Sequence, residues 1–135
     1  MLNPIDAAGE SSIPNAPGML PSIAMLDWNT AQPNARYWAL KMIIDNFRPG
    51  DKLVETSSGS GNVTAQAFVS PRGERKLLVI NKREREFAVD LPEFGGGRLQ
   101  MIDLATGSNP PASSSIAGTS IKLGGFGIAV VTLAK

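Results

Sequence analysis

Few side chains in this sequence could do chemistry, because it contains neither cysteine nor histidine. A disulfide framework, a thiolate metal site, a His-dependent triad and an imidazole base are therefore excluded. Carboxylates and aromatic rings remain, and two groups of them stand in loop-like sequence: Glu10, in a glycine- and serine-containing stretch, and the run Asp27, Trp28 and Asn29. A carboxylate could serve as an acid or base or accept a local hydrogen bond, and an indole ring could stack on a ligand or pack in a core.

The charge and hydropathy patterns argue against several classes of protein. The formal net charge is +1 and the basic residues are scattered, which is not the footprint of a nucleic-acid-binding surface. No apolar run approaches the roughly 20 residues that span a bilayer. The first residues, MLNPIDAAGESSIP, have neither a basic n-region nor an apolar h-region, so they do not form a signal peptide. We expect no nucleic-acid partner and no membrane partner.

Two glycine-rich segments and two isolated aspartates offer no cofactor or metal site. Gly59–Asn62 and Gly124–Gly127 do not stand between a strand and a helix, so they are interpreted as turns rather than phosphate-binding loops. Asp90 and Asp103 are too far apart in sequence for a calcium loop. The sequence predicts neither a cofactor nor a bound metal.

Residues 51–135 have the pattern of an antiparallel β-sandwich of about seven to eight strands, in a mainly β protein. Val63–Ser70 alternates with a period of two, whereas Lys76–Asn81 is apolar at consecutive positions, as in a strand buried on both sides. Turn signals recur at the spacing of about 8–12 residues that is typical of sandwiches, and no βαβ crossover is present. The other expected strands lie near Leu53–Ser57, Phe87–Leu91, Arg98–Leu104, Ser120–Leu123 and Gly127–Leu133.

Two connections between these strands have a distinctive composition. Lys82–Glu86, with the sequence KRERE, is predicted to be a charged, solvated hairpin loop rather than a binding patch. Ser108–Ser115 contains two prolines and four serines and is predicted to break the chain between strands.

Residues 1–50 contain one expected strand, a loop and one expected helix. Ser22–Leu26 is short and apolar, as in a strand covered on both faces, and Asp27–Gln32 follows it as a loop. Pro33 stands where the first turn of a helix tolerates proline, and Gly50 follows the expected helix end. One strand and one helix cannot form a core alone, so we interpret them as the last β/α unit of a larger α/β structure. The expected apolar stripe of the helix consists of Tyr37, Leu40, Ile44 and Phe47, widened by Trp38 and Ile43.

The segment Leu26–Thr56 resembles the end of the catalytic barrel in bacterial (β/α)8 glycoside hydrolases that carry a C-terminal β-sandwich. The likeness is to family 39-like members of the clan that places its acid and its nucleophile on strands four and seven. Ile5–Pro14 resembles the loop before the eighth strand, and Pro21–Asn29 resembles that strand. KLLVINKREREFAVDLP and IKLGGFGIAVVTLAK resemble strands of such accessory domains.

The resemblance implies that the catalytic carboxylates lie outside this chain, which alone should have no hydrolytic activity. Glu10 does not stand in the family's nucleophile motif, so it is a solvated or locally bonded carboxylate unless it contacts substrate. Trp28 would follow the eighth strand, at the end of the barrel where active sites lie. There its indole could stack on a sugar while Asp27 and Asn29 bond to hydroxyls, or it could pack beneath the rim with Asp27 capping the loop.

The resulting hypothesis is a non-catalytic C-terminal fragment whose sandwich packs on the barrel of its parent enzyme. The partners are then the catalytic barrel and, in the complete enzyme, carbohydrate; the resemblance also implies a secreted or periplasmic parent. The alternative is a free-standing carbohydrate-binding or protein-interaction sandwich. A carbohydrate-binding module needs several exposed aromatic rings, and the sandwich offers only Phe68, Phe87, Phe94 and Phe126.

Overall fold

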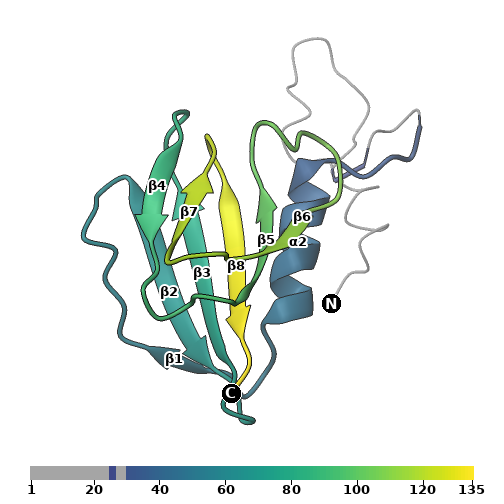
Figure 1. The fold of residues 1–135 in the computed structure, drawn as a ribbon. Coiled ribbons are helices and arrows are strands. Elements are labelled where there is room, and N and C mark those ends of the chain that lie inside the picture. Colours follow the sequence, from purple (N-terminus) through teal and green to yellow (C-terminus); the bar gives the residue numbers. More distant parts are fainter. Residues whose placement is uncertain (1–24, 27–29) are drawn as a thin grey trace.

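The computed structural model describes residues 25–26 and 30–135 of the chain, and they contain one helix followed by eight strands (Figure 1). Helix α2 extends from Ala35 to Asn46. The strands are β1 (Lys52–Val54), β2 (Val63–Val69), β3 (Arg75–Asn81), β4 (Phe87–Asp90), β5 (Arg98–Ile102), β6 (Ala112–Ser115), β7 (Ser120–Leu123) and β8 (Ile128–Leu133).

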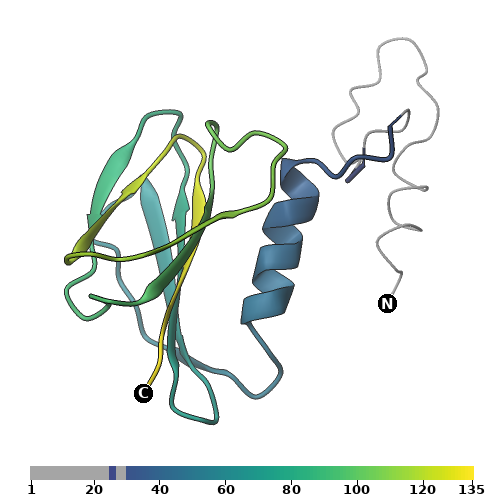
Figure 2. The ribbon, with the colours of Figure 1, turned by 45° about the vertical axis from the view of Figure 1, so that its right-hand side comes forward.

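The strands form two antiparallel sheets, which confirms the predicted β-sandwich. The larger sheet has six strands in the order β1-β2-β3-β8-β5-β6, and the smaller consists of β4 and β7. The larger sheet lies between the smaller one and helix α2, so the molecule has three layers (Figures 1 and 2). The described chain is therefore mainly β, a sandwich with a single short helix before it.

Strand β3 is buried on both faces, as its apolar sequence predicts. Leu77 and Val79 point into the core between the two sheets, whereas Leu78, between them in sequence, packs against residues of helix α2. The strand pairs with β2 on one side and β8 on the other, so no edge of it is open. This central position explains why the usual alternation of apolar and polar residues is absent from β3.

The main core fills the space between the sheets. Its fully buried members include Val79, Leu123 and Val131, each with an exposed fraction of 0%. Residues from both sheets contribute, since Leu123 belongs to β7 and the other two to β3 and β8. The complete buried cluster is Val63, Leu77, Val79, Leu91, Leu99, Ile116, Ile121, Leu123, Ala129 and Val131.

The charged segment Lys82–Glu86 is solvated as predicted, but the prediction that it forms a hairpin loop is wrong. Strand β4 pairs with β7 rather than with β3, so the segment crosses from one sheet to the other. Asn81, which is 1% exposed, holds the start of this crossing. Its Nδ2 donates to the carbonyl oxygens of Arg85 and Gly124, each at 2.8 Å, and its Oδ1 accepts from the Arg83 amide.

The prediction of a break over Ser108–Ser115 is wrong in its second half, where residues 112–115 form strand β6. This strand lies at the edge of the six-stranded sheet and pairs with β5 alone. All four of its residues are exposed, so it has no apolar face from which a sequence pattern could arise.

Helix α2 begins at Ala35, two residues after the proline that was expected in its first turn. Asn34 is the N-cap, and its Oδ1 accepts a hydrogen bond from the Tyr37 amide at 3.2 Å. Pro33 therefore precedes the cap instead of lying in the first turn. The end of the helix is as predicted: the Phe47 amide donates to Ile43, and Gly50 adopts a positive φ of 97°.

Candidate interaction surface

The four residues that the sequence suggested for substrate contact, Glu10, Asp27, Trp28 and Asn29, lie outside the residues that the structure describes. Their roles therefore stay predictions, as does the eighth barrel strand. The division into residues 1–50 and 51–135 also stays a prediction. The described part places the chemistry-bearing and interaction-bearing groups elsewhere, on and around helix α2.

One side of α2 packs on the six-stranded sheet. Met42, 2% exposed, is the centre of this contact and forms a buried cluster with Ile102 of β5 and Val130 of β8. Residues 35, 38, 39, 42 and 46 are the helix positions that turn inward or are buried, a spacing of three and four that defines one face of an α-helix. The surrounding side chains are Ala35, Trp38, Ala39, Phe47, Leu78 and Ile128.

Trp38, which was expected to widen the apolar stripe of the helix, packs in this interface. Its ring contacts Tyr37 edge-on, with 5.1 Å between the ring centroids. Its Nε1 donates to the carbonyl oxygen of Ser108 at 3.1 Å, which ties the helix to the β5–β6 connection. The indole ring therefore packs against apolar neighbours, and its N–H group has a hydrogen-bond acceptor.

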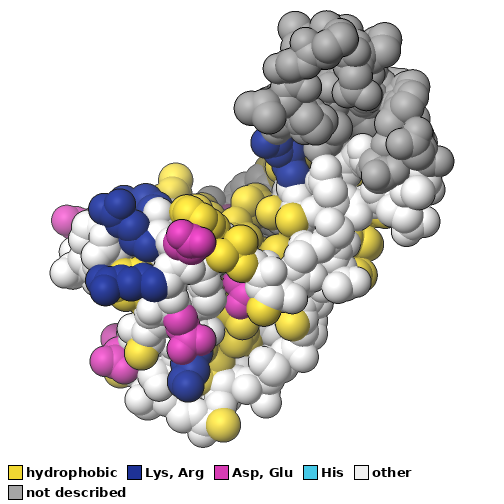
Figure 3. Space-filling view, turned by 90° about the horizontal axis from the view of Figure 1, so that it is seen from above, with side chains coloured by type: hydrophobic (Ala, Val, Ile, Leu, Met, Phe, Trp, Pro, Cys, Tyr) yellow, Lys and Arg dark blue, Asp and Glu magenta, His cyan; other side chains and the backbone are white. Residues whose placement is uncertain are grey.

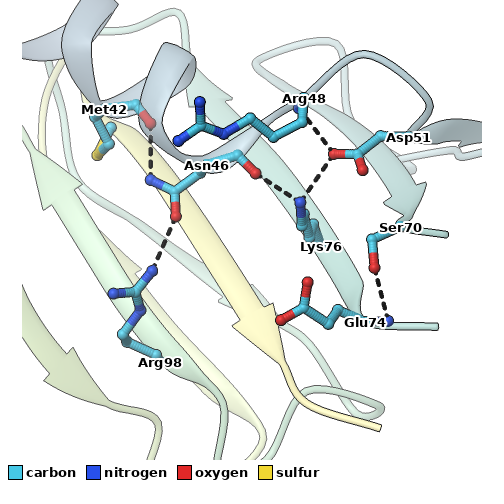
Figure 4. Close-up of polar contacts among 8 residues, drawn as sticks. All are labelled: Met42, Asn46, Arg48, Asp51, Ser70, Glu74, Lys76 and Arg98. Carbon is cyan, nitrogen blue, oxygen red and sulfur yellow. Dashed lines mark hydrogen bonds and ion pairs between the residues drawn. The ribbon is translucent and has the colours of Figure 1, made fainter. Parts of the chain in front are cut away.

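Asn46, in the last turn of α2, joins the helix to strand β5 (Figure 4). Its Nδ2 donates to the Met42 carbonyl oxygen at 2.7 Å and to Gln100 Oε1 at 2.8 Å. Its Oδ1 accepts from the Arg98 guanidinium at 3.0 Å. Because Asn46 is 7% exposed, these bonds replace water almost completely and fix how the helix lies on the sheet.

Lys76 of β3 forms a second polar link between the sheet and the end of the helix (Figure 4). Its Nζ donates to the Asn46 carbonyl oxygen at 2.7 Å and to Asp51 Oδ2 at 2.9 Å. The Lys76 and Asp51 side chains are 8% and 4% exposed, so the ion pair is buried. The Arg48 amide also donates to the same carboxylate oxygen at 3.1 Å.

The pKa of the Asp51 carboxyl is held below its ordinary value of 3.8 by this environment. The hydrogen bond from the Lys76 ammonium is the main cause, and the Arg48 backbone amide adds to it, while burial of the carboxyl acts in the opposite direction. Asp51 is therefore ionised at neutral pH and serves as the counter-ion of a buried lysine.

The opposite side of α2 is apolar as well, but nothing in the described chain covers it. Leu40 and Ile44 are 41% and 53% exposed. They belong to the predicted stripe, and they point away from the sheet, nearly opposite the side that packs through Met42. Phe47 departs from the stripe, since its ring turns to Phe68 of β2 with 4.5 Å between centroids.

A small ion pair flanks this outer side. Lys41 and Asp45 are one helical turn apart, and the Lys41 ammonium donates a hydrogen bond to the Asp45 carboxylate at 2.7 Å, which raises the pKa of Lys41. The outer side of α2 thus combines two exposed aliphatic side chains with a solvated charge pair.

The described residues offer no cluster of the usual metal ligands. They contain no group of three histidine, cysteine, aspartate or glutamate side chains that could hold a metal ion. Nor do they include a helix long and apolar enough to cross a membrane.

A second apolar exposure lies at the end of the sandwich that carries the β3–β4, β5–β6 and β7–β8 connections. Leu104 and Phe126 are 58% and 59% exposed there. Figure 3, which views this end, shows hydrophobic side chains gathered between basic and acidic ones. Phe126 has a φ of 48°, an uncommon conformation for an aromatic residue, in a turn whose other members are glycines.

Sequence reasoning missed the polar link between helix and sheet. Lys76 opens an apolar run, where a charged residue is usually the solvated end of a strand. One signal was available: the end of the expected helix leaves carbonyl groups free, which a lysine ammonium can satisfy, and the carboxylate of Asp51 follows that end in sequence. Which of them Lys76 would meet depended on the packing of the helix.

Comparisons with known proteins agree with this architecture. Residues 60–131 match the family described as D-apionate lactonase, C-terminal immunoglobulin-like domain. No curated protein sequence matches the chain.

Three solved structures show the same fold at low sequence identity. The catalytic domain of GH30 xylanase C from Talaromyces cellulolyticus has a TM-score of 0.67 and 17% identity, over 84% of this chain and 28% of that one. The family 30 subfamily 8 xylanase Xyn30A from Clostridium acetobutylicum has a TM-score of 0.64 and 10% identity, over 84% and 31%. A conserved exported protein from Bacteroides fragilis has a TM-score of 0.54 and 12% identity, over 71% and 21%. The chain thus spans less than a third of each of these proteins.

Proposed function

This chain belongs to the family of D-apionate lactonase C-terminal immunoglobulin-like domains, and from this premise we propose that it is a non-catalytic accessory domain that packs on a catalytic (β/α)8 barrel and stabilises it. Helix α2 carries the proposal, because it is apolar on two opposite sides and the sandwich covers only one. Large apolar side chains exposed side by side commonly mark a surface that another protein layer covers. The sandwich is one such layer, and the barrel is the proposed second one.

The polar link at the end of α2 supports the same role. Asn46 and Lys76 fix the helix on the sheet through bonds of 2.7–3.0 Å, so Leu40 and Ile44 are presented in a defined position. A pre-oriented apolar surface loses little conformational entropy when a partner covers it. The expected partner is therefore a rigid protein surface.

The parent enzyme is proposed to act on carbohydrate or on a sugar-derived lactone. The family's description names a lactonase, and two of the similar structures are xylanases of family 30. The more specific likeness to family 39 rests on sequence resemblance alone, and these similarities give it no support. In the complete enzyme Trp28, with Asp27 and Asn29, would lie at the barrel rim and contact the sugar, whereas Glu10 is proposed to bond locally.

A free-standing carbohydrate-binding module is less well supported. Such a module stacks sugars on several exposed aromatic rings, but in the described sandwich only Phe126 is exposed. Phe87 and Phe94 pack against the main core and Phe68 against Phe47. A single exposed ring does not make a platform for a polysaccharide chain.

The proposal is tested by reconstituting the chain with a catalytic barrel. The chain is co-expressed with the separate barrel portion of a protein from the same family, and association is measured by pull-down and gel filtration. We expect a stable equimolar complex, which the double substitution Leu40→Glu and Ile44→Glu abolishes and the exposed control Lys122→Gln leaves intact. We also expect the chain alone to show no lactonase or xylanase activity.

Two results would overturn the proposal. One is failure of the unaltered chain to associate with a folded barrel. The other is specific binding of a polysaccharide by the isolated chain that the Leu40 and Ile44 substitutions do not affect, which would favour the module.

A further inference from the structure

An open depression of 520 Å³ lies at the end of the sandwich opposite the β3–β4 connection. Three segments that are distant in sequence meet there: the link from α2 to β1, the β2–β3 turn and the end of β8 (Figures 1 and 2). The lining residues are Gly50, Lys52, Val69, Ser70, Pro71, Arg72, Gly73 and Lys135.

Three of the lining side chains are cationic. Lys52, Arg72 and Lys135 come from the three different segments, and no acidic side chain lines the depression. Within the described chain none of the three takes part in an ion pair. The adjacent carboxylate of Asp51 is paired with the Lys76 ammonium, so its charge is already balanced. A terminal carboxylate at Lys135 would carry one negative charge, so the depression would still have a net positive charge from its three cations.

Ser70 adds a buried hydrogen-bonding group to this lining. The residue is 7% exposed, and its Oγ accepts a hydrogen bond from the Glu74 amide at 3.1 Å (Figure 4). Among the described residues, that Oγ donates to no acceptor, although a hydroxyl carries one donor. Because Ser70 lines the depression, a ligand oxygen there could accept this proton.

The β2–β3 turn holds these groups in place. The Gly73 amide donates to the Ser70 carbonyl oxygen at 2.9 Å, which closes a turn with Pro71 at its second position, where proline is favoured. Gly73 has a φ of 86°, and a β-carbon built on it would lie 3.0 Å from Cδ of Lys135. The aliphatic part of Lys135 thus lies along the glycine, which brings its ammonium group to the turn.

We propose that this depression binds a small polyvalent oxyanion of the phosphate or sulfate type. Three unpaired cations supply the charge, and the Ser70 hydroxyl supplies a directed donor, the combination by which proteins hold such anions. Its volume falls in the range of about 300–1,000 Å³ that is usual for ligand sites, so the anionic group could belong to a larger molecule. The depression shares no residue with the outer side of α2, so the proposal is independent of barrel docking.

The probe is inorganic phosphate, added to the complete ¹⁵N-labelled chain at constant ionic strength and followed by NMR. We expect saturable shifts of the Lys52, Ser70 and Gly73 amides, with a Kd of about 1 mM, as befits a solvent-exposed site of few contacts. Arg72→Gln should weaken binding about 5-fold, the usual effect of one exposed charge interaction. Ser70→Ala should weaken it about 3-fold by removing the donor, and the control Lys122→Gln should leave it unchanged.

Competition by other anions shows which property of the ligand the site recognises. Sulfate should compete with phosphate at the same amides, and a monovalent carboxylate such as acetate should be at least about 5-fold weaker, because it carries a single charge. The proposal is overturned if the shifts are linear and spread over the surface, if chloride at equal ionic strength reproduces them, or if Arg72→Gln leaves the affinity unaltered.

Discussion

Lys76 shows how one buried charge can organise a helix–sheet contact. Its ammonium group bonds to Asn46 in the last turn of α2 and to Asp51 beyond the helix, and the side chain is 8% exposed. Removing one partner of a buried pair leaves the other charge without water or a counter-ion. The pair therefore constrains the position of α2 more than it raises stability over an apolar alternative.

Lys76→Met should lower the free energy of unfolding by about 3 kcal/mol, because it leaves the Asp51 carboxylate buried and unpaired. Urea unfolding followed by circular dichroism measures this change. The matched control is the double substitution Lys76→Met and Asp51→Leu, which removes both charges and should recover most of the loss. A single variant as stable as the unaltered chain would show that the pair is not buried in solution.

The lowered pKa of Asp51 also predicts how stability depends on pH. The unfolded carboxyl has the ordinary value of 3.8, and the folded value is lower because the Lys76 ammonium bonds to the ionised form. The stabilisation is therefore complete above the unfolded value and is lost as the pH falls through the folded value. The stability difference between the unaltered chain and Asp51→Asn should be constant from about pH 5 to 8 and shrink below about pH 4. A difference that persists unchanged at low pH would contradict this assignment.

The two sides of helix α2 differ in how far they are buried in the described chain. Met42 is 2% exposed on the inner side, whereas Ile44, two residues later, is 53% exposed on the outer side. Met42→Ala should cost about 2–4 kcal/mol through the cavity it leaves. Ile44→Ala should change stability by about 0.5 kcal/mol or less, as is usual for surface substitutions. Thermal and urea unfolding of the two variants measure the contrast, and equal losses would mean that the outer side is already covered.

The β7–β8 turn depends on a close approach of the backbone. A β-carbon added to Gly124 would overlap the Asp103 carboxylate, whereas one added to Gly118 would meet nothing within 4 Å. We expect Gly124→Ala to lower stability by at least about 2 kcal/mol and the control Gly118→Ala to leave it nearly unchanged. Comparing the denaturation midpoints of the two variants decides the matter, and a neutral Gly124→Ala would show that Asp103 moves away freely.

At the scale of the whole described chain, the protein is a sandwich with a helix attached through a shared core. Ile102 and Val130 of the six-stranded sheet are 4% and 1% exposed, and they form a buried cluster with Met42 of α2. Expressed alone, residues 51–135 should therefore bind the dye ANS and self-associate, since an apolar sheet face becomes accessible. Gel filtration of this fragment beside the full chain measures the effect. A soluble, monomeric fragment that binds no dye would support the proposed domain boundary at residue 50.

Much of the fold could be predicted from local patterns in the sequence. The alternation in Val63–Val69, the apolar run of β3 and the punctuation by glycine and proline identify strands, and the caps of α2 confine the helix to within a residue or two. Strand β6 was not predicted because all its residues are exposed and so show no apolar pattern. It forms a strand because it pairs with the edge of β5. Glu10, Asp27, Trp28 and Asn29 remain predictions from resemblance.

The sequence by itself determined the class of the protein: a mainly β sandwich preceded by a helix, without cysteine or histidine chemistry. The tertiary structure decided which side of α2 is covered, why β4 pairs with β7, and that Lys76 is buried against Asn46 and Asp51. The physical reason is the distance along the sequence over which each kind of interaction acts. Periodicity and turn residues act over a few positions, whereas these three outcomes depend on contacts between segments about 20 or more positions apart, whose partners local patterns do not specify.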